Sequence, residues 1–169
     1  MDYDPSWSAR FEAICADIER ACGERIVCVE HVGSTAIPGM AAKPIIDVQP
    51  GLRAFEDGFA CIQPLERLGY LSRGEWGMPG RHYFVRDHAD GLREHVHMLA
   101  MNSERWHEMP LFRDYLIAHP EEARAYETLK RDLAEQFKLD RDQYTNAKAA
   151  FVHNALVLAR EWDAAGRPI

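Results

Sequence analysis

Apolar residues near the N-terminus recur at the spacing of an α-helix. They are Phe11, Ile14, Cys15, Ile18 and Cys22. Asp4 followed by Pro5 is typical of a helix start, because proline fits the first helical position, and Gly23 is typical of a helix end. The pattern therefore predicts a first helix that starts near residue 5 and stops before Gly23.

Segments rich in β-branched residues follow and predict four strands. These are residues 25–32, 43–49, 81–86 and 94–101. Residues 55–68 predict a helix between the second and third strands, and Pro50-Gly51 should end the second strand. Asp90-Gly91 is typical of a hairpin turn, so the last two strands should be antiparallel.

From Ser103 onward the pattern is that of helices only. Ser103, His119-Pro120 and Asp140 each offer a helix start, and we expect no strand within residues 103–162. The sequence thus predicts an α/β (α+β) fold with a mixed sheet flanked by helices over residues 1–102. Residues 103–169 form a C-terminal helical extension, which we expect to pack on this core.

Composition narrows the classes of partner. The 169 residues are 47% hydrophobic and carry a formal net charge of −7, so a folded domain is expected and nucleic acid is not an expected partner. A small phosphorylated ligand needs only a few local donors and stays compatible with this charge. No apolar stretch approaches the roughly 18 residues that span a bilayer. We therefore expect no membrane partner and a cytoplasmic location.

One segment carries candidate chemistry, because a predicted strand ends in Gly33-Ser34. A turn at this point exposes backbone N–H groups, and a glycine lets an anion approach them closely. Ser34 and Thr35 add hydroxyl donors, and Lys43 adds a cation. Gly33, Ser34, Thr35 and Lys43 are therefore the candidate ligands of a nucleotide or another phosphate.

The next predicted strand places Asp47 and Gln49 on one face, because side chains alternate along a strand. A Gly-Ser loop followed by a strand with Asp-x-Asp or Asp-x-Glu resembles the layout of polymerase-β-type nucleotidyltransferases. In those enzymes the acids hold magnesium against a triphosphate. This resemblance makes Asp47 the candidate catalytic residue.

The stretch HVGSTAIPGMAAKPIIDV resembles the signature of the GrpB family, whose members are nucleotidyltransferase-like. The similarity continues in YDPSW, in the HVH strand, in FRDYLIAHP and in YTNAKAAFV, so it covers nearly the whole chain. The resemblance implies a nucleotidyltransferase-type fold with C-terminal helices. It implies no particular substrate.

Two departures from the nucleotidyltransferase layout bear on catalysis. Gln49 stands where a second carboxylate is expected, and the HVHML strand has no third acid. His95 and His97 face one way on that strand and could join Asp47 in a site for a divalent metal, with zinc, manganese or iron suited to imidazole and magnesium to carboxylates. The alternative is two histidines that are only hydrogen-bonded at a strand edge.

The leading interpretation is a nucleotidyltransferase-like protein that binds a nucleotide or phosphorylated ligand and could transfer a nucleotidyl group. A non-catalytic sensing or interaction module on the same fold, and a metal-dependent enzyme that uses histidine and aspartate, remain open. Trp76 and Arg81 could form a lid or belong to an ordinary surface loop. Lys148 and Arg113 fit structural contacts better than ligand contacts.

Overall fold

The computed structural model describes residues 1–137 and 140–167 of the chain. The chain divides into two compact units, Met1–Pro110 and Leu111–Ile169. The first unit holds the sheet, and the helix α3 (Glu104–Ala118) runs from the first unit into the second. The division of the chain at residue 102 that the sequence suggests stays a prediction of domain organisation.

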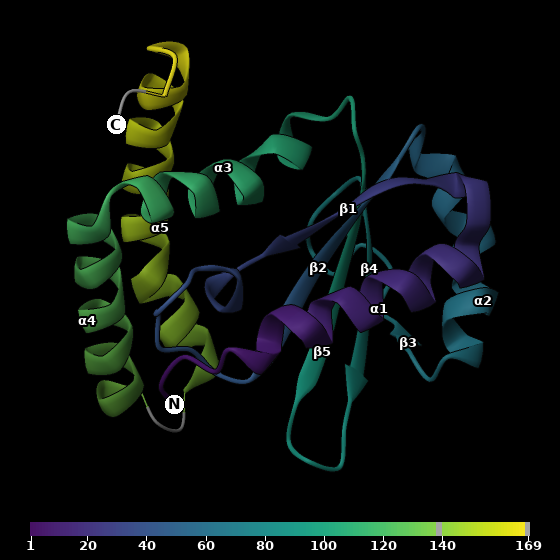
Figure 1. Ribbon diagram of the computed structural model, residues 1–169, viewed down its shortest axis with the longest axis horizontal. Coiled ribbons are helices and arrows are strands. Elements are labelled where there is room, and N and C mark those ends of the chain that lie inside the picture. Colours follow the sequence, from purple (N-terminus) through teal and green to yellow (C-terminus); the bar gives the residue numbers. More distant parts are fainter. Residues whose placement is uncertain (138–139, 168–169) are drawn as a thin grey trace. The chain divides into compact units, whose positions relative to one another are not determined.

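A five-stranded mixed sheet forms the centre of the first unit (Figure 1). Its strands are β1 (Ile26–Val32), β2 (Ile45–Leu52), β3 (Leu71–Ser72), β4 (Arg81–Asp87) and β5 (Arg93–Ala100). Their spatial order is β1-β2-β5-β4-β3. The strands β2 and β5 are parallel, and the other neighbours are antiparallel. The predicted mixed α/β fold is confirmed.

The helices of this unit begin and end where local chemistry favours it. The helix α1 (Ser6–Cys22) starts after Asp4, whose carboxylate accepts a hydrogen bond from the Ser6 N–H at 2.8 Å. It ends at Gly23, whose φ of +61° suits glycine. Two short 3₁₀ turns, Gly23–Arg25 and Ser34–Ala36, flank β1.

The predicted helix over residues 55–68 is in fact two pieces. A 3₁₀ segment, η3 (Phe55–Cys61), leads into α2 (Ile62–Arg67). Gly58 lies in η3, where a Cβ would collide with the ring of His82. The close approach to His82 requires glycine, which is a poor helix former.

The prediction that Pro50-Gly51 ends the second strand was wrong. Strand β2 continues to Leu52, with Pro50 opposite Val29 of β1 and Gly51 opposite Cys28. The register of β1 shifts just beyond, between Ile26 and Cys28, and such a bulge accommodates an irregular partner strand. The two-residue strand β3 was not predicted, because it is too short to show alternation.

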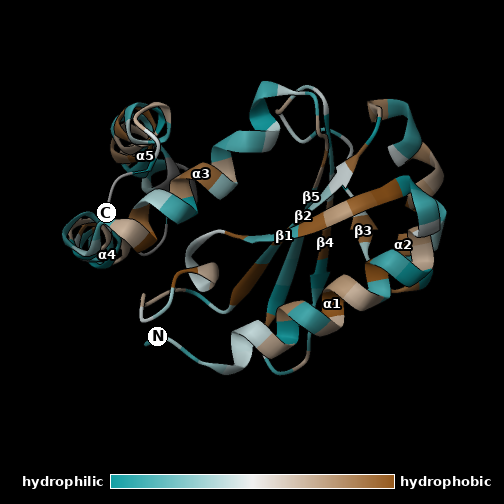
Figure 2. Cartoon of the chain, turned by 45° about the horizontal axis from the view of Figure 1, so that its top comes forward, coloured by the Kyte–Doolittle hydropathy of each residue, from teal (hydrophilic) through white to brown (hydrophobic). Residues whose placement is uncertain are grey.

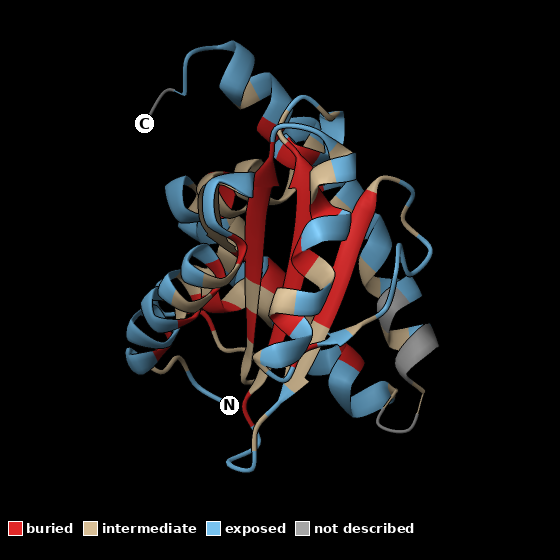
Figure 3. Ribbon diagram, turned by 90° about the vertical axis from the view of Figure 1, so that its right-hand side faces the viewer, coloured by how far each residue is buried: buried red, intermediate tan, exposed pale blue. Residues whose placement is uncertain are grey.

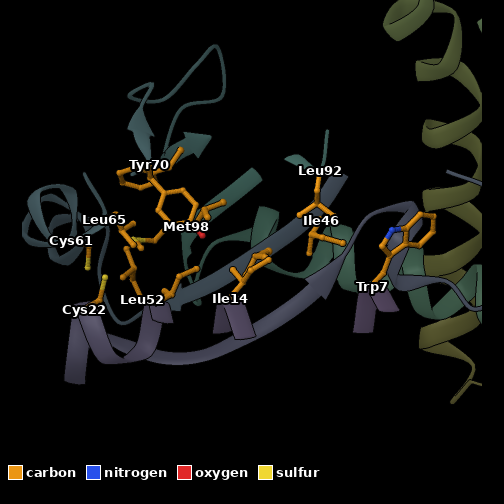
Figure 4. Close-up of a cluster of buried hydrophobic side chains, with 14 residues drawn as sticks. Trp7, Ile14, Cys22, Ile46, Leu52, Cys61, Leu65, Tyr70, Leu92 and Met98 are labelled. Carbon is orange, nitrogen blue, oxygen red and sulfur yellow. The ribbon is translucent and has the colours of Figure 1, made fainter. Parts of the chain in front are cut away.

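One face of the sheet packs against α1 and α2 and forms the hydrophobic core (Figure 4). The strands contribute Ile46, Val48, Leu52, Phe84, Val96 and Met98, and the helices contribute Ile14, Ile18, Cys22 and Leu65. Each fully buried aliphatic side chain contributes about 1.5–3 kcal/mol. In Figure 2 the strands carry brown, hydrophobic stretches, while α1 shows both colours, as an amphipathic helix should. Figure 3 shows the same division, with buried strands and exposed outer helix surfaces.

The described residues of the second unit form helices joined by short non-helical segments. No strand occurs in residues 103–137 and 140–162, so the expectation of no strand is confirmed for these described residues. It contains the end of α3, α4 (Pro120–Gln136) and α5 (Arg141–Ala164). The Asp140 carboxylate caps α5 by accepting a hydrogen bond from the Gln143 N–H at 2.9 Å, as predicted. The Ser103 hydroxyl, just before α3, donates to the Ala100 carbonyl at 2.6 Å.

Side-chain contacts account for two residues whose role the sequence left open. Arg113 forms an ion pair with Asp114 at 2.7 Å, and the Lys148 ammonium lies 5.5 Å from the centre of the Tyr144 ring. Both contacts lie within the second unit. Among the described residues, no helix has the length and apolar character to cross a membrane.

Candidate functional site

The face of the sheet opposite α1 and α2 carries Asp47 beside two histidines. Asp47 on β2 is paired with His95 on the parallel strand β5, and His97 lies two residues further along β5. The Oδ1 atom of Asp47 is 3.0 Å from Nε2 of His97 and 3.5 Å from Nδ1 of His95. The Asp47 side chain is 21% exposed, and the two imidazoles are 10% and 11% exposed. The structure therefore brings together the three residues of the expected metal site.

The environment keeps Asp47 ionised. Burial alone would raise the pKa of this carboxyl, but hydrogen bonds from His95 and His97 outweigh it and hold the pKa below its ordinary value. The Asp47 carboxylate is mostly shielded from water, and an ionised group in such a place needs a partner that offsets its lost hydration. The two imidazoles provide that pairing.

Arg81 of β4 is joined to the cluster through His97. Its Nη1 lies 3.2 Å from Nδ1 of His97. A guanidinium can only donate, so Nδ1 accepts, and the proton of the neutral imidazole is on Nε2, where it is donated to Asp47. Burial is the main cause that lowers the pKa of Arg81. No carboxylate pairs directly with Arg81 in the described part of the chain, so Arg81, His97 and Asp47 form one charge-balanced chain.

Tyr83 lies beneath this chain of hydrogen bonds. Its ring centre is 4.5 Å from the guanidinium carbon of Arg81, 5.1 Å from the His97 ring centre and 5.6 Å from that of His95. Such packing fixes the orientation of both imidazoles. Neither Tyr83 nor the Arg81–His97 contact was predicted from the sequence, although a hairpin centred on Asp90-Gly91 places Tyr83 opposite His97.

The Gly33-Ser34 turn reaches the same carboxylate from β1. Gly33 has a φ of +75°, and a Cβ at this position would collide with the carboxylate of Asp47. Gly33 therefore allows the loop backbone and Asp47 to touch. Ser34 is partly exposed at the start of the 3₁₀ turn, and Lys43 is exposed just before β2. Their proposed contacts with phosphate stay predictions.

Thr35 and His31 make hydrogen bonds within the protein that hold the Gly33-Ser34 loop in place. The buried Thr35 hydroxyl donates to the Ile45 carbonyl at 3.0 Å and lies 3.1 Å from Nε2 of His31. His31 stacks on Phe11 of α1 with 4.7 Å between ring centres, on the core side of the sheet. In this arrangement the Thr35 hydroxyl has no proton to offer a phosphate, and His31 does not pair with Asp47.

Gln49, two residues after Asp47 and on the same face of β2, is fully buried. Its Nε2 donates to the Trp106 carbonyl at 2.7 Å and so holds the first turns of α3. The residue that stands in place of a second carboxylate therefore has a structural contact.

The donor set suits a transition metal better than magnesium. One atom from each of Asp47, His95 and His97 lies within 4.8 Å of the other two. Two imidazoles and one carboxylate match zinc, manganese or iron, whereas magnesium prefers oxygen ligands. A cation on Nε2 of His97 needs the lone pair there, so the proton must move to Nδ1 and Arg81 must withdraw. Asp47 requires no such change, and His95 would have to give up any proton on Nδ1, the nitrogen that faces Asp47.

Comparisons with known proteins agree with this architecture. The family model "GrpB protein" matches residues 1–157. The UPF0157 protein YqkA of Bacillus subtilis is 35% identical over 95% of this chain, and the glutamate-rich protein GrpB of Alkalihalophilus pseudofirmus is 32% identical over 92%. The matched regions are 46% of the first relative and 92% of the second, so this chain spans about half of YqkA.

A more distant relative has a different name. The chain is 28% identical to a dephospho-CoA kinase of Mycobacterium bovis, and the match covers 94% of this chain but 45% of that protein. Among solved structures, the crystal structure of the conserved protein GrpB from Enterococcus faecalis has a TM-score of 0.88 at 32% identity and covers 96% of this chain and 98% of its own. The family model, the relatives and the shared fold together show that this chain belongs to the GrpB family.

Proposed function

We propose that this chain binds a nucleotide or another phosphorylated small molecule where the Gly33-Ser34 turn meets Asp47, together with a divalent cation held by Asp47, His95 and His97. Nucleotidyl transfer is the reaction that such a pair of ligands would permit. The observation that carries the proposal is the contact of one ionised carboxylate with a glycine turn on one side and two imidazoles on the other.

Electrostatics requires the cation if a phosphate is to bind beside Asp47. An ionised carboxylate repels a phosphate, and at close range in a partly buried site this repulsion amounts to several kcal/mol. A divalent cation between the two groups turns the repulsion into attraction for both. The cation and the phosphorylated ligand should therefore bind cooperatively.

A non-catalytic module is the second candidate, and Gln49 favours it. Two-metal catalysis needs a second carboxylate near Asp47, and Gln49 instead donates its amide to the Trp106 carbonyl. A site with one carboxylate can still bind one cation and a ligand. The kinase name of the mycobacterial relative is compatible with a phosphorylated ligand, but more than half of that protein lies outside the match.

Calorimetry and thermal shift test the proposal on protein purified without a histidine tag. We expect manganese or zinc to bind more tightly than magnesium, and ATP to bind more tightly with the metal than alone. A ligand at 100 times its dissociation constant should stabilise the protein by about 2.7 kcal/mol, which thermal shift detects. Asp47→Asn and His95→Gln should both abolish metal binding.

Two exposed residues provide matched controls. Asp132 on α4 and His107 on α3 are exposed, so Asp132→Asn and His107→Gln should leave metal binding unchanged. Absence of metal binding in the wild-type protein, with or without ATP, would contradict the proposal, because the cation is what allows a phosphate to bind beside Asp47. Absence of binding by nucleoside phosphates and by inorganic polyphosphates, with or without metal, would contradict the proposed phosphate site.

A further inference from the structure

We propose that the indole of Trp76 is the surface on which the base of a nucleotide stacks while the phosphates of that nucleotide lie at Asp47. This inference rests on the proposed function. It narrows the ligand from any phosphorylated small molecule to a nucleoside phosphate.

Trp76 is exposed and strained, and both properties are unusual for this residue type. Trp76 is 64% exposed, whereas Trp7 and Trp106 are 1% and 6% exposed. Its φ is +45°, a region that bulky residues rarely adopt because the Cβ meets the backbone. Strain of this kind is concentrated at sites that clamp ligands.

The loop that carries Trp76 is held in place by side chains. Nη2 of Arg81 donates to the Trp76 carbonyl at 3.1 Å and to the Glu75 carbonyl at 3.3 Å. The Glu75 carboxylate accepts a hydrogen bond from the Gly80 N–H at 2.6 Å. A ring on a loop fixed in this way loses little further freedom when a base stacks on it.

The same guanidinium joins this loop to the candidate site. Nη1 of Arg81 donates to His97, and His97 donates to Asp47. The backbone of Trp76 is therefore three hydrogen bonds from the carboxylate, through one arginine and one imidazole. Any movement of Arg81 when a ligand enters would therefore change both its contact with His97 and its contacts with the Trp76 loop.

Positive charge gathers along this connection. The Arg73 guanidinium carbon lies 5.5 Å from the centre of the Trp76 indole. Arg105 is close enough to Arg81 for its charge to reinforce the effect of burial and lower the Arg81 pKa. An aromatic surface beside arginines combines base stacking with attraction for phosphate, as in proteins that bind single-stranded nucleic acids.

The test compares two probes that share phosphates but differ in the base. ATP and inorganic tripolyphosphate are titrated in the presence of manganese into the wild type, Trp76→Gly and Trp76→Phe. Stacking on one aromatic side chain corresponds to about a 5- to 100-fold change in affinity. We expect Trp76→Gly to lose ATP affinity by this factor, Trp76→Phe to lose less, and neither to change tripolyphosphate affinity.

Two further measurements separate stacking from folding. Glycine is the residue best suited to positive φ, so Trp76→Gly should melt at the same temperature as the wild type or higher. ATP should quench tryptophan fluorescence in the wild type and not in Trp76→Phe. Phe59→Ala removes another exposed aromatic, 57% exposed on η3, and should leave ATP affinity unchanged.

The outcomes distinguish this inference from the function on which it rests. If the wild type binds ATP and Trp76→Gly binds it within twofold of the same affinity, the stacking inference is wrong and the proposed function stands. An equal loss for ATP and tripolyphosphate would also overturn the stacking role. If the wild type binds neither probe, the proposed function fails, and the inference fails with it.

Discussion

The α-carbon of Gly33 lies against the carboxylate of Asp47, so that no side chain fits between the end of β1 and the acid on β2. The contact joins the turn that the sequence suggested for phosphate to the residue that it suggested for catalysis. Because the two strands are antiparallel neighbours, β1 ends beside the residue where the polar face of β2 begins. Glycine at this position is required by the acid as well as by the backbone conformation.

Replacing Gly33 with alanine should damage the site more than replacing an unobstructed glycine. Gly33→Ala adds a Cβ that collides with Asp47 at a φ of +75°, whereas Gly39→Ala adds one at a φ of +77° with no atom within 4 Å. Strain from positive φ costs about 1–3 kcal/mol and should be common to both variants. Chemical denaturation should show a larger loss of stability for Gly33→Ala, and calorimetry should show loss of metal binding in that variant alone. Equal effects of the two substitutions would mean that Asp47 moves aside at little cost.

The charge of Asp47 should stabilise the metal-free protein in a defined pH range. The folded-state pKa of this carboxyl is lower than its unfolded value of about 3.9, so its stabilising effect is complete above about pH 5. The effect is lost as the pH falls below 4 toward the folded-state pKa. In urea denaturation with a chelator present, wild type and Asp47→Asn should differ most above pH 5, and the difference should shrink as the pH falls from 4 to 3. A difference that stays constant from pH 3 to pH 7 would show that altered hydrogen bonding, and not the loss of charge, is what destabilises the variant.

Much of this site could be predicted because a strand alternates its side chains. Alternation predicts that Asp47 points to one face of β2 and that His95 and His97 point to one common face of β5. The pairing of β2 with β5 places these side chains on the same face of the sheet and in contact. Alternation could not say which residues of β1 share that face. The antiparallel register pairs Val32 with Asp47, and His31 stacks on Phe11.

Arg81 shows a different limit of the sequence. It is paired with Leu99 on β5, and its long side chain reaches diagonally to His97. A strand pattern gives the pairing only when the hairpin register is known, and it never gives the direction of a flexible side chain. The inward turn of the Thr35 hydroxyl was beyond prediction for the same reason, since it depends on how far the loop folds back to Ile45.

Restoring the missing carboxylate at position 49 should destabilise the protein instead of creating a magnesium site. Gln49 is fully buried and donates to the Trp106 carbonyl, and aspartate would leave that carbonyl unpaired beside a buried charge. We expect Gln49→Asp to lose about 2–4 kcal/mol of stability in urea denaturation. Gln49→Met keeps the size and removes only the hydrogen bond, so it should lose about 1–2 kcal/mol. A stable Gln49→Asp protein that binds magnesium tightly would show that α3 can release this contact.

Arg81 should weaken metal binding at the site to which it belongs. Its guanidinium donates to Nδ1 of His97, which places the proton on Nε2, and a metal cannot bind a nitrogen that carries a proton. In Arg81→Gln the amide oxygen can accept a proton on Nδ1 and so favours the form of His97 with a free lone pair on Nε2. Since partners of metal-bound histidines change affinity by about 10- to 100-fold, we expect zinc and manganese to bind Arg81→Gln roughly tenfold more tightly than wild type. The control for this prediction is Arg73→Gln, which removes the guanidinium beside Trp76 and should leave metal affinity unchanged. Both variants should be measured by competition with a metal-sensitive dye, with melting curves to confirm that each is folded. Weaker metal binding in a folded Arg81→Gln protein would mean that Arg81 supports the ligand set, and that the cation lies on Asp47 and His95 while His97 keeps its proton.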